Sequence, residues 1–529
     1  MALKPAPKFV LYFAVIFVIG FGIQRMLISR GVKPSSSSSS ASPTSTTSSS
    51  PLSGLTSMFS TSKPLTVCTN TWGGYAAMYY YNGGDTPSKD SRFYKEQGVQ
   101  VGFVKIDDLE PSRAAWKSND CQVLWVTADS FPTESADLAG LKPKIFIQYD
   151  WSRGGDVAVG MGTVRNIQDL RGINGRKVRV AAAKGSPSMT LLAKLLEAGN
   201  LRYSDIEFIG IDSAPQAAEM FKSGKVDVAI VWSPDDKDCL DAQKSAGAHV
   251  LMSTKDVPYA IADVLYSKES VIGERRSDLV GFTAGVLTAS AELNASQLVR
   301  KQAAAILAKA MKQDVGFMEL AVENVRFTTY GDNLSFFEMA STTRGSITGQ
   351  ELYNQMGATF AELGLAPNSL PSWRSLTDTS ILEAVGAKLK ATGDQAAEGA
   401  FKFSAPTAAE ANAEAFATKR VTVNFATDSA ELDLVAKKMI DSALGGTAKS
   451  FASVRARIVG NTDNTGSASH NQELSERRAH AVAEYLVRTY GFDENRFTWR
   501  GDGPNNPVAP NATADGRAQN RRTDFELVK

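Results

Sequence analysis

The sequence predicts a multidomain protein with an N-terminal transmembrane helix, a large α/β body and a smaller α+β domain at the C-terminus. Three observations predict this fold class. A long apolar run at residues 9–28 precedes a serine-rich stretch. Between residues 65 and 385, short apolar strands alternate with helices. Residues 419–529 contain a β-α-β-α-β-β pattern, which is typical of two helices packed on a sheet.

The apolar run is the first element. Residues 9–23 carry no charge and residues 26–28 extend the run, so its length approaches the roughly 20 residues that cross a bilayer. Lys4 and Lys8 also fit the start of a signal peptide, which leaves cleavage as the alternative. Because no pair of small residues suited to cleavage follows Ile23, we expect an uncleaved signal anchor with residues 1–8 as its tail.

The serine-rich stretch is the second element. Residues 35–54 consist mostly of Ser, Thr and Pro, which cannot bury a core, so we interpret residues 29–64 as a flexible linker. About 30 such residues have a root-mean-square reach of roughly 30 Å. The linker would tether a globular body to the membrane.

Charge and motifs exclude several function classes. The net charge of +1, with both signs interspersed, provides no basic face for nucleic acid. The sequence has no P-loop, GxSxG or HExxH motif, and the spacing of Asp129, Asp150 and Asp156 favours a polar cleft as much as a catalytic set. We therefore expect neither an enzyme nor a cofactor.

Cysteine and histidine usage argues against a metal site. Three cysteines are too few for a disulfide scaffold and are wrongly spaced for zinc, and the three histidines are scattered. Cys68 and Cys121 both lie in expected strands. They are consistent with one disulfide in an oxidising compartment and equally with two buried thiols.

The body contains eight expected strands, with helices at residues 188–199 and 214–224 among the segments between them. Such alternation favours mostly parallel sheets, in which ligands gather beyond the carboxyl ends of the strands. The residues that follow each strand are therefore candidates for a binding site. The expected strands are residues 65–70, 99–106, 121–128, 144–150, 177–183, 206–212, 226–232 and 249–254.

Four segments of the body resemble the periplasmic solute-binding proteins of nitrate, sulfonate and taurine transporters. These segments are "WGGY" at 72–75, "DWSRGGD" at 150–156, residues 167–201 and "FKSGKVD" at 221–227. The resemblance implies two lobes around a cleft, with the second lobe at about 157–262 and crossings near 150–156 and 261–266. We expect a small anionic solute, which the sequence does not identify; a cleft that has lost its transport ligand is the alternative.

The sharpest local feature of the expected cleft is "GSPSM", residues 185–189. Gly185 permits close approach, and Ser186 and Ser188 with the free N–H groups of a helix start would hold an anion. Simple capping of the helix by one serine is the alternative. The tryptophans after strands are equally consistent with cleft walls and core packing. The candidate cleft residues are Trp72, Gly73, Asp129, Asp150, Trp151, Ser152, Gly185, Ser186, Ser188, Asp212 and Trp232.

An alanine-rich segment, residues 386–418, is expected to link the body to the C-terminal domain. In that domain we expect strands at 420–425, 454–462, 496–503 and 521–528, with helices at 430–444 and 471–489. At about 100° per residue, Arg478 falls on the same arc of the second helix as Leu474, Val482 and Leu486. An arginine so placed needs an anionic partner or a ligand.

The C-terminal motif resembles the OmpA-like peptidoglycan-binding domains. The matching residues are Thr462-Asp463, Leu474-Ser475, Arg478-Ala479, Val482 and Leu486, followed by Asn511, Gly516, Arg517, Asn520, Arg521 and Arg522.

The resemblance implies binding of diaminopimelate in the peptidoglycan stem peptide. Asp463 would receive its ammonium and Arg478 its carboxylate, with help from Asn471. A structural ion pair between Asp463 and Arg478 is the alternative, and Arg521 and Arg522 fit a rim or a solvated strand end. The candidate residues are Thr462, Asp463, Asn471, Arg478, Asn511 and Arg522.

These inferences predict a single-pass inner-membrane protein with residues 29–529 in the periplasm, where it binds peptidoglycan and a small solute. The layout also resembles the subunits that anchor flagellar stators. Residues 9–28 contain no Asp or Glu that could bind a conducted ion, so in such a complex we expect a structural or regulatory role. That alternative implies a multispanning membrane partner, and a homo-oligomer stays open.

Overall fold

The computed structural model describes residues 63–341, 345–423, 425, 426 and 428–529. They belong to one compact unit, Thr61–Lys529. The predicted signal anchor at 9–28 and nearly all of the linker at 29–64 lie outside the described residues. Within the described part of the chain, no helix is both long and apolar enough to cross a membrane.

The first sheet of the body has six strands in the order β11-β4-β10-β3-β1-β2. The strands β2, β1 and β3 run parallel, and β10 and β11 join as antiparallel neighbours. All five residues of β3 are buried, as expected for a strand covered on both faces. The strands are β1 (Leu65–Thr69), β2 (Val101–Lys105), β3 (Val123–Thr127), β4 (Pro143–Ser152), β10 (Ala262–Lys268) and β11 (Val325–Phe327).

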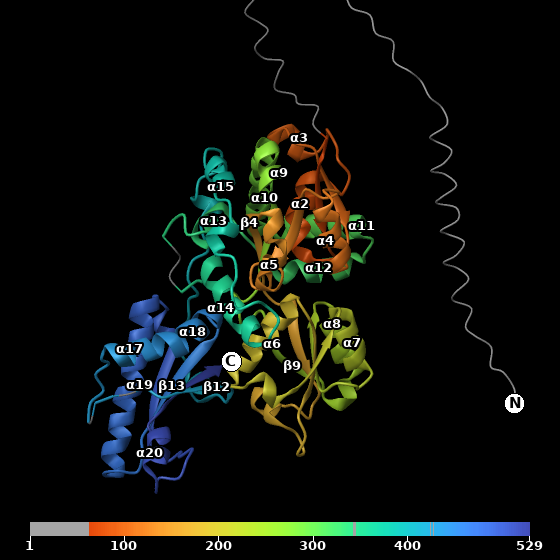
Figure 1. The fold of residues 1–529 in the computed structure, drawn as a ribbon. Helices are drawn as coiled ribbons and strands as arrows, with labels where there is room; N and C mark the ends of the chain where they lie inside the picture. The colour runs from red at the N-terminus through yellow and green to blue at the C-terminus, as the bar shows by residue number, and fades with distance from the viewer. Residues whose placement is uncertain (1–62, 342–344, 424, 427) are drawn as a thin grey trace, which may run out of the picture. The chain divides into compact units, whose positions relative to one another are not determined.

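Helices from both ends of the body surround this sheet. Figure 1 shows α10 and α2 side by side, although more than 190 residues separate their starts. The helices are α2 (Ala76–Asn82), α3 (Arg92–Gln97), α4 (Leu109–Lys117), α5 (Ser135–Leu138), α9 (Glu269–Glu274), α10 (Arg276–Ala295), α11 (Gln297–Met311), α12 (Val315–Glu323), α13 (Tyr330–Phe336), α14 (Gly349–Glu362) and α15 (Ser380–Val385).

The second sheet has five strands in the order β7-β6-β8-β5-β9. The chain enters it between β4 and β5 and returns to the first sheet between β9 and β10, which makes the body two-lobed. Its elements are β5 (Asp156–Gly160), β6 (Arg179–Ala183), α6 (Pro187–Ala198), β7 (Glu207–Ile211), α7 (Ala214–Lys222), β8 (Val228–Trp232), α8 (Asp235–Ala242) and β9 (His249–Ser253).

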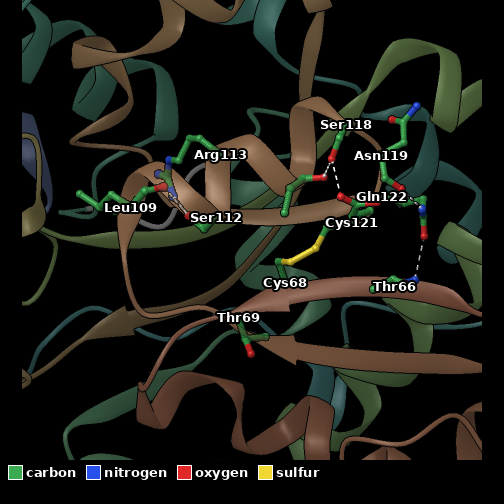
Figure 2. The surroundings of a disulfide bond; sticks show 12 residues. Thr66, Cys68, Thr69, Leu109, Ser112, Arg113, Ser118, Asn119, Cys121 and Gln122 are labelled. Carbon is green, nitrogen blue, oxygen red and sulfur yellow. Dashed lines mark hydrogen bonds between the residues drawn. A yellow bond between two sulfur atoms is a disulfide. The ribbon is translucent and has the colours of Figure 1, made fainter. Parts of the chain in front are cut away.

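A disulfide joins Cys68 on β1 to Cys121, just before β3 (Figure 2). The bond closes a sequence separation of 53 residues. Of the two alternatives consistent with the sequence, the structure therefore has the disulfide. Cys239 is a buried free thiol.

The C-terminal domain has a four-stranded sheet in the order β12-β15-β13-β14. Helix α19 packs on β13 and β14, with Leu474, Val482 and Leu486 buried as predicted. A Cβ on Gly460 would lie 2.1 Å from the backbone oxygen of Ser475, so glycine is required for this close packing. The elements are α16 (Ala408–Asn412), β12 (Ala415–Val421), α17 (Leu434–Ile440), α18 (Gly446–Ser450), β13 (Arg455–Asn461), α19 (Ala468–Tyr490), β14 (Phe497–Gly503), α20 (Ala514–Asn520) and β15 (Thr523–Val528).

The segment expected to be a linker, residues 386–418, differs from that expectation in two ways. The first strand of the C-terminal domain begins at Ala415, inside the segment expected to be a linker, and ends at Val421. Earlier in that segment, Gln395 is buried and donates to the backbone oxygen of Leu287, while Glu398 pairs with Arg153. The alanine-rich composition of this segment does not indicate these polar contacts, which hold the segment against the body.

Candidate ligand-binding sites

A cavity of about 450 Å³ opens at the carboxyl ends of strands from both lobes. We call it the outer chamber. Its walls come from the segments that follow β1, β2, β6, β7 and β8, together with α12, as the rule for open α/β sheets leads one to expect. Its lining includes three aromatic side chains, four polar side chains and four acids: Trp72, Trp232 and Phe317; Asn70, Ser186, Ser233 and Gln313; Asp107, Asp108, Asp212 and Asp235.

A smaller cavity of about 30 Å³, the inner chamber, continues the outer one. The two share Asn70, Trp72 and Trp232 as walls. The remaining lining of the inner chamber is Trp125, Asp156, Pro187, Ile261 and Asp263. Gly155 lets Trp72 approach closely, because a Cβ on Gly155 would lie 2.0 Å from the indole ring.

Four buried carboxyl groups form the floor of the cleft. Asp156 and Asp263 line the inner chamber, whereas Asp129 and Asp150 lie behind it. Asp150 pairs across the strands with Asp263 and accepts a hydrogen bond from Trp72 Nε1 at 3.2 Å. The other carboxyls accept from hydroxyl groups: Asp156 from Ser152 at 2.8 Å, Asp129 from Thr190 at 2.6 Å and Asp263 from Tyr149 at 3.2 Å.

Burial makes these carboxyl groups hard to ionise. It raises the pKa of Asp129 and Asp150 to about 7 and that of Asp156 to about 8. Burial, together with the negative charge of Asp150, also raises the pKa of Asp263 well above its ordinary value. Asp156 Oδ1 and Asp150 Oδ1 make no hydrogen bond to any described residue. The floor therefore has unused acceptor capacity.

The predicted cleft residues divide into two groups. Trp72, Ser186, Asp212 and Trp232 line the outer chamber. Ser186 also caps α6, because its Oγ accepts from the N–H of Ser188 at 3.3 Å, as the capping alternative expected.

The other predicted residues lie outside the lining. Gly73 and Ser152 are buried beside it, Gly185 is exposed with a positive φ, and Ser188 Oγ is buried with no hydrogen bond to a described residue. Trp151 packs edge-on against Tyr259 and Phe336, away from both chambers. Neighbouring residues on a strand face opposite sides of the sheet, so the side chain of Trp151 lies on the face of β4 opposite to that of Asp150.

Several lining residues were missing from the sequence-based set. Asn70 and Asp107 come directly after β1 and β2, so the rule of searching beyond strand ends would have found them. Trp125 and Asp263 lie within strands. No local signal distinguishes them from core residues.

The C-terminal domain has its own pocket, of about 90 Å³, which includes Arg478, Arg521, Arg522 and Asn461 in its lining. Arg478 is held by backbone oxygens: Nε donates to Ser429 at 2.9 Å, and one terminal nitrogen donates to Ala426 at 3.2 Å. Its guanidinium also lies 4.9 Å from the centre of the Phe425 ring. Among the described residues, no carboxylate forms an ion pair with it.

Asp463 pairs with Arg521, not with Arg478. Its Oδ2 accepts from Arg521 at 2.6 Å, and its Oδ1 accepts from the N–H of Thr465 at 2.9 Å. Burial would raise the pKa of Asp463, but these two contacts outweigh it and hold the pKa below its ordinary value. The alternative of a direct Asp463–Arg478 ion pair is absent from the described contacts.

The other predicted residues of this domain support the pocket. Asn471 donates to the backbone oxygen of Thr465 at 2.9 Å, which orders the loop after Asp463. The backbone N–H of Thr462 donates to Gly503. Asn511 accepts from Asn520, and the buried Arg522 donates to Asp524 at 3.1 Å while lining the pocket. Asn511 thus lies beside the pocket rather than in it.

Comparison with known families identifies this domain. Residues 424–521 match the OmpA family. The match includes Asp463, Arg478 and Arg521, and the resemblance expected for the C-terminal domain is confirmed.

Curated relatives are similar to a short part of this chain. Outer membrane protein A of Bordetella avium is 53% identical over 70 residues, which are 13% of this chain and 36% of that protein. Peptidoglycan-binding protein ArfA of Mycobacterium bovis is 46% identical over 77 residues, which are 15% of this chain and 23% of that protein. The chain thus spans between about a quarter and just over a third of the length of these two relatives.

The chain also aligns with solved structures of binding proteins. The periplasmic aliphatic sulphonate binding protein SsuA from Escherichia coli is 17% identical, with a TM-score of 0.46. The alignment covers 61% of this chain and 99% of SsuA.

Proposed function

We propose that this chain is an envelope protein that holds peptidoglycan through its OmpA domain and binds a small solute in the cleft of its body. The observation that supports peptidoglycan binding is the set of contacts around Arg478. Its guanidinium lines a pocket, is fixed by two backbone oxygens, and has no carboxylate partner among the described residues. A half-buried guanidinium that is fixed in position and has no carboxylate partner can bind an anionic ligand.

The carboxylate of diaminopimelate fits this requirement. An arginine can bind a carboxylate through two parallel N–H donors, which a lysine cannot do. The ammonium of the same ligand would reach Asp463 by displacing Arg521, whose side chain is 48% exposed and therefore free to move. The similarity to ArfA of Mycobacterium bovis, a peptidoglycan-binding protein, supports the same partner.

The solute-binding role of the body rests on the two chambers. The volume of about 450 Å³ falls within the range of small-molecule sites, and the walls combine aromatic and polar side chains. The cleft lies where the chain crosses between two sheets, the position at which a hinge would close it.

Anchoring in the inner membrane is proposed from the sequence alone. The apolar run at 9–28 would cross the membrane, and the serine-rich linker would carry the body and the OmpA domain into the periplasm. Peptidoglycan binding sets the orientation, because the ligand lies on that side. Residues 1–8 would then be cytoplasmic.

Sedimentation with purified peptidoglycan tests the proposal. The full chain, purified in a mild non-ionic detergent, should pellet with peptidoglycan, and Arg478→Lys should weaken this binding by ~2 kcal/mol or more, about 30-fold, because the two-pronged contact is lost. The matched control is Arg477→Lys, since Arg477 is exposed on the same helix. Equal pelleting of both variants, each with an unchanged thermal melt, would contradict the proposal.

A further inference from the structure

The charge of the cleft is opposite to that expected from the sequence. Neither chamber has a Lys, Arg or His among its described lining residues, whereas six carboxyl groups line the two chambers. Lys105 neutralises one of them, because its ammonium lies 3.0 Å from Asp107. The remaining five are Asp108, Asp156, Asp212, Asp235 and Asp263.

The chambers also contain the aromatic walls that bind cations. Trp72 and Trp232 line both chambers, and Trp125 and Phe317 add one further ring to the inner and outer chamber respectively. The face of an indole ring attracts a positive charge, most strongly where water is excluded. An anion in the same place would meet the carboxyl groups that line the chambers.

The inner chamber has the dimensions of one small polar group. Its volume of about 30 Å³ exceeds the roughly 10–15 Å³ that a cavity needs to hold one water-sized molecule, so a group as small as an ammonium fits. Asp156, which is 4% exposed, lines it and has one carboxyl oxygen without a hydrogen bond to any described residue. Buried acceptors in proteins normally have a donor, so this oxygen of Asp156 is available to a donor group of a ligand.

We propose that the cleft binds a small organic cation, whose ammonium group enters the inner chamber between Trp72, Trp125 and Trp232 and contacts Asp156 and Asp263. The rest of the molecule lies in the outer chamber beside Trp232 and Phe317. This inference rests on the proposed solute-binding role and names the class of solute. It replaces the anion expected from the sequence.

The titration behaviour of the floor is consistent with this assignment. Asp156 faces Asp263, Asp150 and Asp129, which approach from β10, β4 and the end of β3, and the Trp232 indole approaches from β8. Without a ligand, burial favours the protonated carboxyls. A bound ammonium would favour their ionised form and release protons to solvent. Cation affinity should therefore rise as the pH increases from about 6 to about 9.

Isothermal titration of the full chain in mild detergent at pH 8 tests the assignment. The probes are two cations, putrescine and ethanolamine, and two anions without an amino group, methanesulfonate and nitrate. We expect saturable binding of at least one cation and of neither anion. Asp156→Asn should weaken that binding at least 10-fold. Asparagine resembles the protonated carboxyl in shape and charge, so this variant should keep the fold, as a thermal melt can verify.

Asp137→Asn serves as the matched control, because Asp137 is exposed on α5 and lines neither chamber. It should bind like the unmodified chain. Binding of methanesulfonate or nitrate that Asp156→Asn alters would overturn the assignment of a cation and leave the solute-binding role intact. Cation binding that Asp156→Asn leaves unchanged would place the ligand elsewhere and overturn the inference. No binding of any probe would contradict the solute-binding role as well.

Discussion

Asp156 shows how one buried residue can link the stability of the body to pH. This residue is 4% exposed, and one of its two carboxyl oxygens accepts a hydrogen bond from Ser152. The other oxygen has no hydrogen bond to a described residue. Burial raises the pKa of Asp156 to about 8, so the folded chain keeps it protonated at pH values where the unfolded chain has it ionised. Asp129 and Asp150, whose pKa values burial raises to about 7, act in the same direction.

The sign of the pH effect follows from proton binding. Between about pH 4 and pH 8 the folded state holds protons that the unfolded state has lost, so the free energy of unfolding should fall as the pH rises. Because asparagine cannot titrate, the free energy of unfolding of Asp156→Asn should fall less steeply with rising pH than that of the unmodified chain. Urea unfolding at pH 5, 6, 7 and 8 measures the difference. Parallel pH profiles for the variant and the unmodified chain would show that Asp156 is ionised in the fold.

At the scale of elements, the disulfide ties β1 to the segment before β3 (Figure 2). It closes 53 residues that include β2, α2, α3 and α4. Replacing both Cys68 and Cys121 with alanine should lower the free energy of unfolding by about 2–4 kcal/mol, because the unfolded chain gains conformational freedom. Denaturant melts of the variant and the unmodified chain measure this. A reducing agent should lower the stability of the unmodified chain and leave that of the variant unchanged.

The strands show how far sequence patterns could predict the fold. All eight expected strands of the body are present, since continuous apolar runs such as 123–127 mark strands covered on both faces. Strands β5, β10 and β11 were missed. β10 contains the buried Asp263 and ends in Lys268, and β11 has three residues, so neither has the apolar run of a central strand.

The residues of the binding sites could be predicted from the sequence to a smaller extent than the strands. Trp72, Ser186, Asp212 and Trp232 line the cleft because they follow strands, a position that can be identified from sequence. The sign of the ligand charge was not predictable, because it depends on Asp263 and Trp125, which fold onto the cleft from within strands of the first sheet. Likewise, the pairing of Asp463 with Arg521 joins residues 58 positions apart.

At the scale of the whole molecule, the serine-rich linker separates an expected membrane anchor from everything that binds a ligand. Proteolytic cleavage between residues 35 and 54 should release a soluble fragment that still binds peptidoglycan. Washed membranes free of cell-wall fragments, separated by centrifugation before and after cleavage, provide the measurement. A cleaved fragment that still sediments with these membranes would contradict anchoring through residues 9–28.

The central claim is that the OmpA domain binds peptidoglycan through Arg478, and titration with a soluble stem peptide that contains diaminopimelate tests it most directly. The full chain should bind the peptide saturably, Arg478→Lys should lower the affinity about 30-fold, and Asp156→Asn should bind like the unmodified chain because its substitution lies in the cleft. Equal affinity of the unmodified chain and Arg478→Lys for the peptide, with both proteins folded, would contradict the claim.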